Sequence, residues 1–417
     1  MMRVAHVVTR CIAGAGGVAV RGAIGLDPSR YESVLVTGTS SGRLLDQARE
    51  HGIEVVVVPE LRSPLRPTED LAALRRLRRL FGARQFDVVH THSAKAGALG
   101  RVAAHSVGVP RVVHTIHGFP FHDFQGWAPH SAYVSIERRL ARITDAFLAV
   151  GTNVAVEALR RGLAQPEQLH TIGPAVDPPS VWLSPQTRAR ARSLLDLPDD
   201  VLVVGTVGRL DYQKAPEHLL EAMSRLHHPA VLVWVGDGEL AATAARTAAR
   251  LGITDRVRLL GHRDDVQQLL PAFDVFAMAS RYEGLPCAVV EAQQCGIPVV
   301  ATAVNAVPDV VIPGETGLLV PPARPDLMAR ALDHALGHPS QARQWATAAR
   351  LHLGSRYDPA TLADVLDVVY SGAERRDSRR LPANSRPRAH TGGRGRADSE
   401  PTLAGGVGHR HGWVAAR

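Results

Sequence analysis

Cysteine is scarce in this chain of 417 residues, which contains only three. Cys11, Cys287 and Cys295 are too few for a disulfide framework, and their spacing is not that of metal ligands. This composition excludes the class of small disulfide-stapled secreted domains and fits a reducing compartment. We therefore expect a cytoplasmic protein.

Long apolar runs are also missing. No uncharged apolar stretch approaches the ~18 residues that a membrane span needs, although 45% of the residues are hydrophobic, as in ordinary soluble proteins. The amino-terminal segment is interrupted by Arg3, His6 and Arg10, so it predicts a first strand and not a signal peptide.

Lysine is almost absent, because 46 of the 48 basic residues are arginine. The two exceptions, Lys95 and Lys214, both lie in turns that follow predicted strands. A compact ammonium and a planar guanidinium are not interchangeable at a phosphate site. The two lysines are therefore candidates for contact with phosphate groups.

The formal net charge of +8 is concentrated at one end of the chain. Residues 373–417 contain ten arginines and four acidic residues, and so contribute +6 of it. This tail is rich in glycine, proline and serine and has few large apolar residues, which predicts disorder. It has no interleaved aromatic residues and no docking motif, so we expect no specific nucleic-acid partner.

Short apolar runs alternate with helical patterns in both halves of the chain, which predicts an α/β fold with two doubly wound parallel sheets. The strands expected in the first half are residues 4–8, 33–36, 55–58, 88–90, 111–115 and 146–150. Those expected in the second half are residues 201–206, 230–235, 257–260, 274–278, 298–302 and 317–320. The segment 172–184 is interrupted by prolines and has no periodicity, so it is expected to link the two domains.

Residues 280–296 have the pattern of a loop followed by a helix. Pro286 suits the first helical position, and Gly296 suits the residue after the last. The amino terminus of such a helix would face the carboxyl ends of the strands, where a diphosphate is favoured. Glu283 precedes the helix, and Glu291 lies about 7.5 Å further along its axis at ~1.5 Å per residue. The two carboxylates can therefore contact different parts of one elongated ligand.

The sequences EGLPCAVVEA and CGIPVVAT in this region resemble the signature of retaining GT-B glycosyltransferases of glycosyltransferase family 4. The resemblance implies that Glu283 contacts the donor sugar, that Gly284 and Leu285 help to bind the donor, and that Glu291 binds the ribose of the nucleotide. It also implies two Rossmann-like domains that face each other across a cleft. The expected divisions are an acceptor-side domain (1–175), a nucleotide-sugar-binding domain (186–355), a helix crossing back to the first domain (356–372) and the basic tail (373–417).

A second motif, VGTVGRLDYQKAP, combines a predicted strand with a basic turn. It resembles the family's Gly-Arg-Leu turn and the lysine that follows it, which implies that Gly208, Arg209 and Lys214 hold the donor diphosphate. Two cations at the end of a strand can neutralise the charge that develops on a departing nucleoside diphosphate.

Two sites depart from the family pattern. Ala215 stands where a glycine is usual, and Asn305 and Ala306 replace a pair of glycines, which leaves less backbone freedom. We therefore infer no donor sugar from these positions. Asp237 and Glu239 are expected to shape and cap their turn, and we expect neither a metal nor another cofactor at the site.

The glycine-rich sequence CIAGAGGVAV follows the first predicted strand. The resemblance implies that Gly16 and Gly17 approach the donor diphosphate from the first domain. Gly14, Gly16 and Ala19 also satisfy a relaxed dinucleotide fingerprint, but the end of the second strand offers no acid for a ribose. An NAD-dependent oxidoreductase is therefore disfavoured.

The runs HTHSAKAG and VVHTIHGF closely resemble family members that build bacterial surface polysaccharides. The resemblance implies that His117 is the active-site histidine, a neutral imidazole that orients a hydroxyl and can change its charge near pH 7. His90, His92 and His114 are expected to satisfy local backbone groups or to pack within the sheet, and not to bind a metal. Lys95 is a candidate for gripping an acceptor phosphate.

The sequence LAALRRLRRLF at residues 71–81 predicts an amphipathic helix with Arg75, Arg76, Arg78 and Arg79 on its polar face. The simpler interpretation is a helix that packs on the sheet and has a basic exterior. The alternative is peripheral attachment to the anionic inner face of a membrane.

Together these features predict a retaining glycosyltransferase (a hexosyltransferase). It would move a sugar from a nucleoside diphosphate sugar, expected to be a UDP-sugar, to a hydroxyl of a glycan or lipid-linked glycan acceptor in polysaccharide biosynthesis. The alternatives are a GT-B nucleotide-sugar 2-epimerase, a sugar phosphorylase and a catalytically silent scaffold of a glycan assembly complex.

Overall fold

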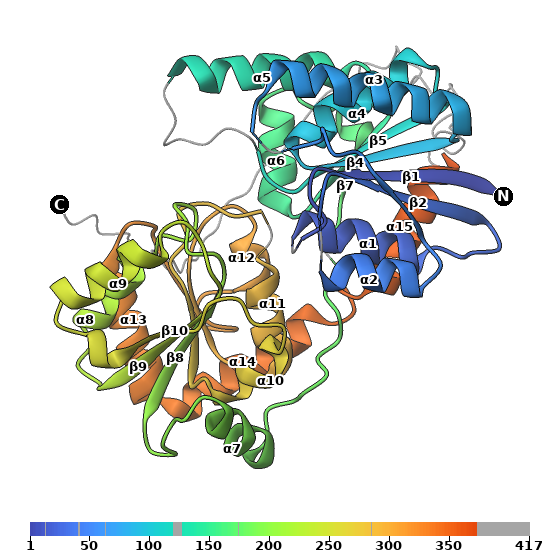
Figure 1. Ribbon diagram of the computed structural model, residues 1–417. Helices are drawn as coiled ribbons and strands as arrows, with labels where there is room; N and C mark the ends of the chain where they lie inside the picture. Colours follow the sequence, from blue (N-terminus) through green and yellow to red (C-terminus); the bar gives the residue numbers. More distant parts are fainter. Residues whose placement is uncertain are drawn as a thin grey trace, which may run out of the picture. The chain divides into compact units, whose positions relative to one another are not determined.

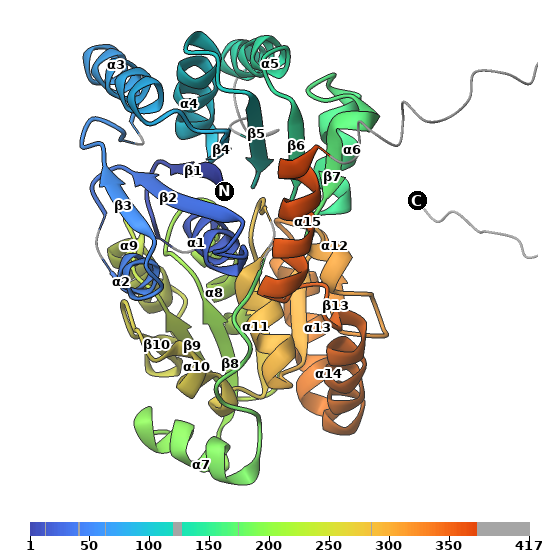
Figure 2. The ribbon, with the colours of Figure 1, turned by 90° about the vertical axis from the view of Figure 1, so that its right-hand side faces the viewer.

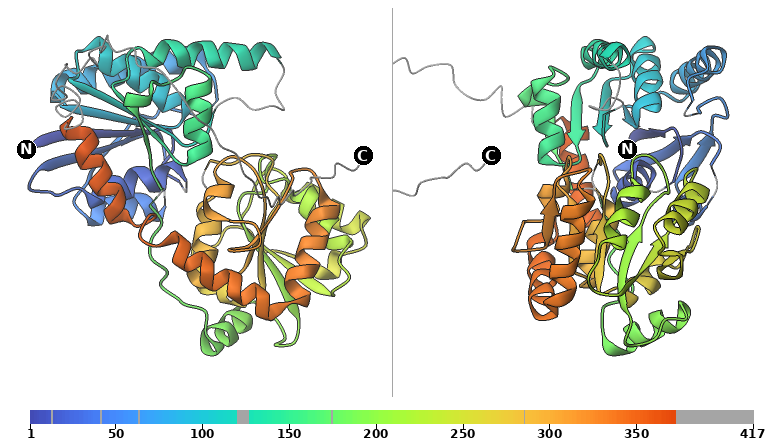
Figure 3. Two further views of the ribbon diagram at one scale, coloured as in Figure 1. Left: turned by 180° about the vertical axis from the view of Figure 1, so that it is seen from behind. Right: turned by 90° about the vertical axis from the view of Figure 1, so that its left-hand side faces the viewer.

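A computed structural model describes residues 1–372 of the chain, apart from 13, 41, 63, 120–126, 174 and 285. It contains two parallel β-sheets that follow one another along the chain, each with helices on both faces (Figures 1 and 3). The prediction of two Rossmann-like, doubly wound domains is confirmed. The tail predicted to be disordered, residues 373–417, lies outside the described residues.

The first sheet has seven parallel strands in the order β3-β2-β1-β4-β5-β6-β7. Its strands are β1 (Met2–Val8), β2 (Tyr31–Thr37), β3 (Glu54–Val57), β4 (Val88–His92), β5 (Arg111–Ile116), β6 (Ala146–Ala149) and β7 (Leu169–Thr171). The helices of this domain are α1 (Ala15–Gly25), α2 (Arg43–Glu50), α3 (Pro67–Arg84), α4 (Ala94–Ser106), α5 (Trp127–Ala141) and α6 (Thr152–Arg160). The strand order reverses between the neighbouring strands β1 and β4, and ligands of open α/β sheets bind at such a switch point.

The second sheet has six parallel strands in the order β10-β9-β8-β11-β12-β13. They are β8 (Leu202–Val207), β9 (Ala230–Val235), β10 (Val257–Leu259), β11 (Val275–Met278), β12 (Val299–Thr302) and β13 (Leu318–Val320). The helices are α7 (Pro185–Leu194), α8 (Pro216–Ser224), α9 (Ala241–Arg250), α10 (Val266–Leu269), α11 (Cys287–Cys295), α12 (Val307–Val310), α13 (Pro325–Gly337) and α14 (Pro339–Leu353). Here the switch point lies between β8 and β11.

Buried aliphatic side chains explain why these runs become central strands. Every residue of β6, β11 and β12 is buried, as expected for parallel strands that are covered by helices on both faces. Their uninterrupted apolar runs are the signal that predicted them.

The last described helix, α15 (Pro359–Ser371), packs against the first domain, beside α1 (Figure 2). Leu362 and Leu366 belong to the same buried cluster as Val4 and Val88 of the first sheet. A glycine in α1 allows this close approach, because a Cβ added at Gly22 would lie 2.9 Å from Cδ1 of Leu366. The end of the described chain thus contributes to the core of the domain in which the chain begins.

Two local details differ from the expectations. Strand β7 was not predicted because its three residues are at most partly buried and include a central histidine. Pro286 is the N-cap of α11 and not its first helical residue, while Gly296 ends the helix in the left-handed conformation, at φ 92°.

Among the described residues, no helix is both long enough and apolar enough to span a membrane.

Candidate functional site

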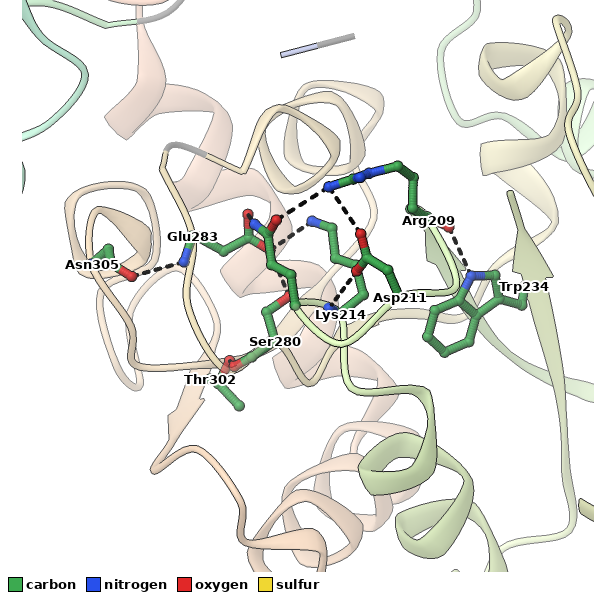
Figure 4. A network of polar contacts seen from close by, with 10 residues as sticks. Arg209, Asp211, Lys214, Trp234, Ser280, Glu283, Thr302 and Asn305 are labelled. Carbon is green, nitrogen blue, oxygen red and sulfur yellow. Dashed lines mark hydrogen bonds and ion pairs between the residues drawn. The ribbon is translucent and has the colours of Figure 1, made fainter. Parts of the chain in front are cut away.

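Lys214 and Glu283 meet at the switch point of the second sheet, on the loops that follow the neighbouring strands β8 and β11 (Figure 4). Nζ of Lys214 lies 2.6 Å from Oε1 of Glu283, and the two side chains are only 17% and 5% exposed. Shielding from water strengthens the attraction between the two charges. The ion pair therefore fixes both groups at the edge of the sheet where ligands bind.

The carboxylate of Glu283 has two further hydrogen-bond donors. Ser280 Oγ donates to Oε1 over 2.5 Å, and Gln213 Nε2 donates to Oε2 over 3.1 Å. Both oxygens are thus held, and the carboxylate has one orientation. This is the preorganisation that a group needs if it is to fix the position of a ligand hydroxyl.

Gly208 makes room for the stem of Lys214. A Cβ added at Gly208 would lie 3.1 Å from Cε of Lys214 and 3.3 Å from its Cδ, so the methylene chain of the lysine lies against the glycine. The carbonyl oxygen of Gly208 accepts a hydrogen bond of 2.9 Å from Nε1 of Trp234. The residue before α8, Ala215, has a positive φ of 49°, which explains why glycine would be usual at this position.

Arg209 lies beside this pair and is more open to solvent, with 57% of its side chain exposed. Its Nη2 is 2.9 Å from Oδ2 of Asp211 (Figure 4). It is also 3.3 Å from Oε1 of Gln213, whose Nε2 donates to Glu283. Because the guanidinium itself is exposed, it can turn from these partners to a phosphate.

Asn305 connects Glu283 to the first domain. Its Oδ1 accepts a hydrogen bond of 2.7 Å from the backbone N of Glu283, and its carbonyl oxygen accepts one of 2.7 Å from Nδ2 of Asn153. Asn305 has a φ of 44°, so its backbone is left-handed, the conformation that suits the glycine usual in the family. Asparagine tolerates this conformation better than most other residues do. Ala306 packs closely on Gly151 of the first domain, where an added Cβ would lie 2.4 Å from Cβ of Ala306.

Glu291 lies on α11 near an ion pair that connects the first domain to the segment before α7. Arg21 of α1 donates from Nε and Nη2 to the two carboxylate oxygens of Asp177, over 2.7 and 2.6 Å. Burial raises the pKa of Glu291 to about 7; Arg21 lowers it and Asp177 raises it further. Cys287, one helical turn before Glu291, has its pKa raised to about 12, chiefly by burial.

The raised pKa of Glu291 predicts a dependence of stability on pH. Between about 4.5, its ordinary pKa, and about 7, the folded protein binds a proton that the unfolded chain does not. The contribution of Glu291 to the free energy of unfolding therefore falls as the pH rises through this window. As the pH is raised from 4.5 to 8, we expect the free energy of unfolding of Glu291→Gln to increase by about 1–3 kcal/mol relative to that of the wild type. Urea unfolding of both proteins measures this gain, with Glu315→Gln at an exposed carboxylate as the control; a gain equal to that of the control contradicts the assignment.

His117 follows β5, and its backbone meets the loop that carries Glu283. A Cβ added at Gly284 would lie 1.7 Å from the carbonyl oxygen of His117, so only glycine fits between these two loops. Nε2 of the His117 ring lies 3.0 Å from Nδ1 of His92. The loop that carries the histidine of the first domain thus lies against the loop that carries the ion pair of the second.

The charge state of His117 differs from the expectation. Burial lowers the pKa of His117 to about 3, because the protonated ring would lose its hydration. This direction favours a neutral ring near pH 7 and does not support the expected change of charge there. The surroundings that cause this shift cannot be read from the residues next to His117 in the sequence.

The other predicted residues of the first domain lie at its switch point. Gly16 and Gly17 are buried in the first turn of α1. A Cβ added at Gly16 would lie 3.0 Å from the backbone of Cys11. A Cβ added at Gly17 would lie 2.5 Å from Nη1 of Arg21. Both glycines therefore permit close packing at the start of α1, and Gly17 faces the guanidinium that lies near Glu291.

Lys95 is not positioned as expected for a group that grips an acceptor phosphate. Its Nζ lies 2.7 Å from Oδ1 of Asp70, also donates to the carbonyl oxygen of Pro64, and only 9% of the side chain is exposed. The ammonium ties α4 to the start of α3 and is neutralised within the domain. Nothing in its sequence neighbourhood indicated this partner 25 residues away.

The structure brings together most of the residues that the sequence selected. Lys214, Glu283, Gly208 and Arg209 form one network, and Gly284 connects it to His117. Leu285 lies outside the described residues. Sequence reasoning missed several contributors to this site: Gln213, Ser280, Arg21 and Asp177.

Two family models match the chain. The one described as Glycosyltransferase Family 4 matches residues 12–179, and the one described as Glycosyl transferases group 1 matches residues 187–352. The chain is 31% identical over 284 residues to the UDP-Gal:alpha-D-GlcNAc-diphosphoundecaprenol alpha-1,3-galactosyltransferase of Escherichia coli, over 67% of this chain and 73% of that protein. It is 32% identical over 320 residues to the D-inositol 3-phosphate glycosyltransferase of Salinispora tropica, over 71% of this chain and 66% of that protein.

Solved structures with the same fold include Anabaena HepE in complex with UDP and glucose. It superposes with a TM-score of 0.78 at 21% identity, over 89% of this chain and all of that one. WaaG, a glycosyltransferase involved in lipopolysaccharide biosynthesis, superposes with a TM-score of 0.73 at 17% identity, over 88% of this chain and all of that one. At such identities the likeness is one of fold.

Proposed function

Because this chain belongs to the GT-B glycosyltransferases of family 4, we propose that it transfers a sugar from a UDP-sugar to a hydroxyl of a glycan or lipid-linked glycan acceptor, with retention at the anomeric carbon. The observation that carries the proposal is the shielded pair of Lys214 and Glu283, with Arg209 beside it, at the switch point of the second sheet. The choice of UDP is supported by Anabaena HepE, which was solved with UDP.

The two cations act on the leaving group. As the bond between the anomeric carbon and the β-phosphate oxygen breaks, negative charge grows on the diphosphate, and Lys214 and Arg209 stabilise it. The acceptor oxygen forms its bond to the anomeric carbon on the same face of the sugar. Its proton passes to the departing phosphate oxygen, so no protein side chain acts as general base. Because Lys214 and Arg209 would supply the positive charge that the diphosphate needs, we propose that added Mg²⁺ leaves kcat/KM unchanged.

The carboxylates and the glycines position the donor. Glu291 accepts hydrogen bonds from the ribose hydroxyls, and Glu283 orients the sugar next to Gly284. Gly16 and Gly17 let the backbone of the first domain approach the diphosphate closely. His117 is neutral, so it can hydrogen-bond a sugar hydroxyl with the same strength across the physiological pH range.

The basic face of α3 is proposed as a contact with an anionic membrane surface, at which a lipid-linked acceptor would lie. The inner face of this helix is buried through Ala73, Leu77 and Phe81. Leu65 and Leu71 near its start are 72% and 46% exposed. Its outward arginines are Arg75, Arg76, Arg78 and Arg79, all exposed.

Reversing these four charges to glutamate is expected to weaken binding to vesicles that contain phosphatidylglycerol by at least about 10²-fold, since each basic residue near the surface contributes about 1 kcal/mol. Cosedimentation measures the effect. The matched control reverses four exposed arginines of the second domain: Arg246, Arg250, Arg324 and Arg343. Equal loss in the two variants contradicts a specific role for α3.

Acceptor-dependent release of nucleotide tests the proposed activity. The full chain is incubated with a panel of nucleoside diphosphate sugars, with and without membrane extracts that supply lipid-linked glycans. A transferase releases nucleoside diphosphate only in the presence of both substrates. Release without acceptor indicates the nucleotide-sugar 2-epimerase, and no release with any donor indicates the silent scaffold; either outcome contradicts the proposal.

A further inference from the structure

Three buried histidines lie together beneath His117, on neighbouring strands of the first sheet. His6 of β1 is in register with His90 of β4, and His92 follows on the same face two residues later. The three side chains are 0%, 1% and 1% exposed. Their ring centroids are 5.5 Å apart for His6 and His90, 5.9 Å for His6 and His92, and 4.1 Å for His90 and His92.

The hydrogen bonds of this group are unevenly distributed. Both ring nitrogens of His6, and Nε2 of His92, have no hydrogen-bond partner among the described residues. His90 is fully paired, to Tyr370 Oη over 2.6 Å and to Thr115 Oγ1 over 2.7 Å. A buried polar group without a partner costs about 1–3 kcal/mol, so apolar residues would suit His6 and His92 better unless something binds these nitrogens.

We propose that His6, His90 and His92 form a site for one divalent transition-metal ion, with Zn²⁺ as the best-fitting class. One nitrogen from each ring can be chosen so that all three lie within 4.8 Å of one another. Tetrahedral zinc with Zn–N bonds of ~2.0–2.1 Å needs about 3.4 Å between ligand nitrogens, a contraction that ring rotation can provide. Three imidazoles without thiolate or carboxylate suit zinc and its neighbours in the first transition row.

The protonation states agree with this role. Burial lowers the pKa of His6 to about 3, and burial likewise lowers the pKa of His90 and His92 well below the usual value. All three rings are neutral near pH 7 and have a lone pair to offer. If one ring nitrogen of His90 binds the ion, the other can keep its hydrogen bond to Tyr370 or Thr115. Such a hydrogen bond orients a histidine that binds a metal.

The proposed ion also has a consequence for His117. If Nε2 of His92 binds the metal, its Nδ1 carries the proton and donates to Nε2 of His117, over the 3.0 Å that separates them. His117 then keeps its own proton on Nδ1. This fixed tautomer matters for catalysis only within the proposed function, whereas metal binding itself does not depend on that function.

Cobalt and zinc titrations of the untagged full-length chain test the site, after stripping with a chelator and dialysis. We expect one equivalent of Co²⁺ with the visible absorption of tetrahedral nitrogen coordination, its displacement by Zn²⁺, and a rise of several degrees in the unfolding midpoint with either ion. A surface group could compete, since Nδ1 of His227 and Nδ1 of His228 lie 2.9 and 3.0 Å from Asp333. The double variant His227→Gln, His228→Gln is therefore the control, and it should still bind one equivalent of Co²⁺.

His6→Leu separates a metal site from a merely buried histidine. The variant should lose the Co²⁺ absorption and the shift with Zn²⁺, yet in metal-free form unfold at the same or a higher temperature than the metal-free wild type, because an unpartnered imidazole is gone. His92→Gln should also fail to bind the single equivalent of Co²⁺. This second variant tests the site even if His6→Leu does not fold. The proposal is overturned if the wild type binds less than one equivalent, if both variants bind as the wild type does, or if only the surface control loses the ion.

Discussion

Replacing Lys214 by Met is expected to lower kcat by about 10²–10³-fold, the effect of removing one preorganised group that stabilises a developing anion. The ammonium lies 2.6 Å from Glu283, so it is already at the switch point where the donor diphosphate is proposed to bind. Steady-state kinetics with saturating donor and acceptor measure the loss. Retention of more than a tenth of the wild-type kcat contradicts the role of Lys214.

A loss of stability could imitate this result, because Lys214→Met leaves the shielded carboxylate of Glu283 without its cation. We expect this to cost about 3 kcal/mol of the free energy of unfolding. Adding Glu283→Gln should restore most of the stability and none of the activity, which separates the two effects. Arg324→Met, which breaks an exposed pair with Asp326, is the matched control and should change neither property measurably.

Gly284→Ala is the second substitution with a large expected effect. The added methyl would lie 1.7 Å from the carbonyl oxygen of His117, and a clash with a backbone atom cannot be relieved by rotating a side chain. The two loops must separate, which displaces His117 from the loop of Glu283. A misplacement of about 1 Å at a catalytic site costs about 10²-fold in rate, so we expect kcat/KM to fall by at least that factor.

The unfolding midpoint distinguishes this effect from general damage. Each loop belongs to a different domain, so the clash can be relieved by moving the loops apart while both cores stay intact. We expect the midpoint to change by only a few degrees. Gly82→Ala in α3 is the control, because the atom closest to its added Cβ is 4.0 Å away, and it should raise stability by about 0.5–1 kcal/mol. Wild-type activity in Gly284→Ala contradicts the proposed contact.

The architecture was predictable because buried parallel strands are continuous apolar runs. Segments such as Val275–Met278 and Val299–Thr302 are buried at every residue and have few other conformations open to them. The edge strand Leu169–Thr171 escaped prediction for the opposite reason, since it is short, only partly buried and polar at its centre. The buried strands could be predicted from their apolar residues. A strand at the edge of a sheet is less buried, so its sequence lacks this signal.

At the candidate site, residue types were predictable but their partners were not. Lys214 and Glu283 stood out as a rare lysine and as a carboxylate before a helix, yet their pairing spans 69 residues. Arg21 and Asp177 are 156 residues apart in the sequence, and no local pattern connects them. Such contacts arise only when the strands have been arranged in the sheet.

The surroundings of Lys95 and His117 were not predictable for the same reason. A lysine at the start of a helix and a histidine after a strand look available to a ligand when only their neighbours in the sequence are known. The fold places Asp70 against Lys95, and it surrounds the partly buried ring of His117 with groups that lower its pKa. His6 was read only as an interruption of an apolar run, because its two histidine neighbours come from a different strand.

The position of the donor can be seen in a crystal structure of the chain with a bound UDP-sugar. We expect the diphosphate oxygens to lie within hydrogen-bonding distance of Lys214 and Arg209, and the ribose hydroxyls to contact the carboxylate of Glu291. A nucleotide bound elsewhere, with Lys214 still paired to Glu283 and no phosphate near either cation, would contradict this expectation.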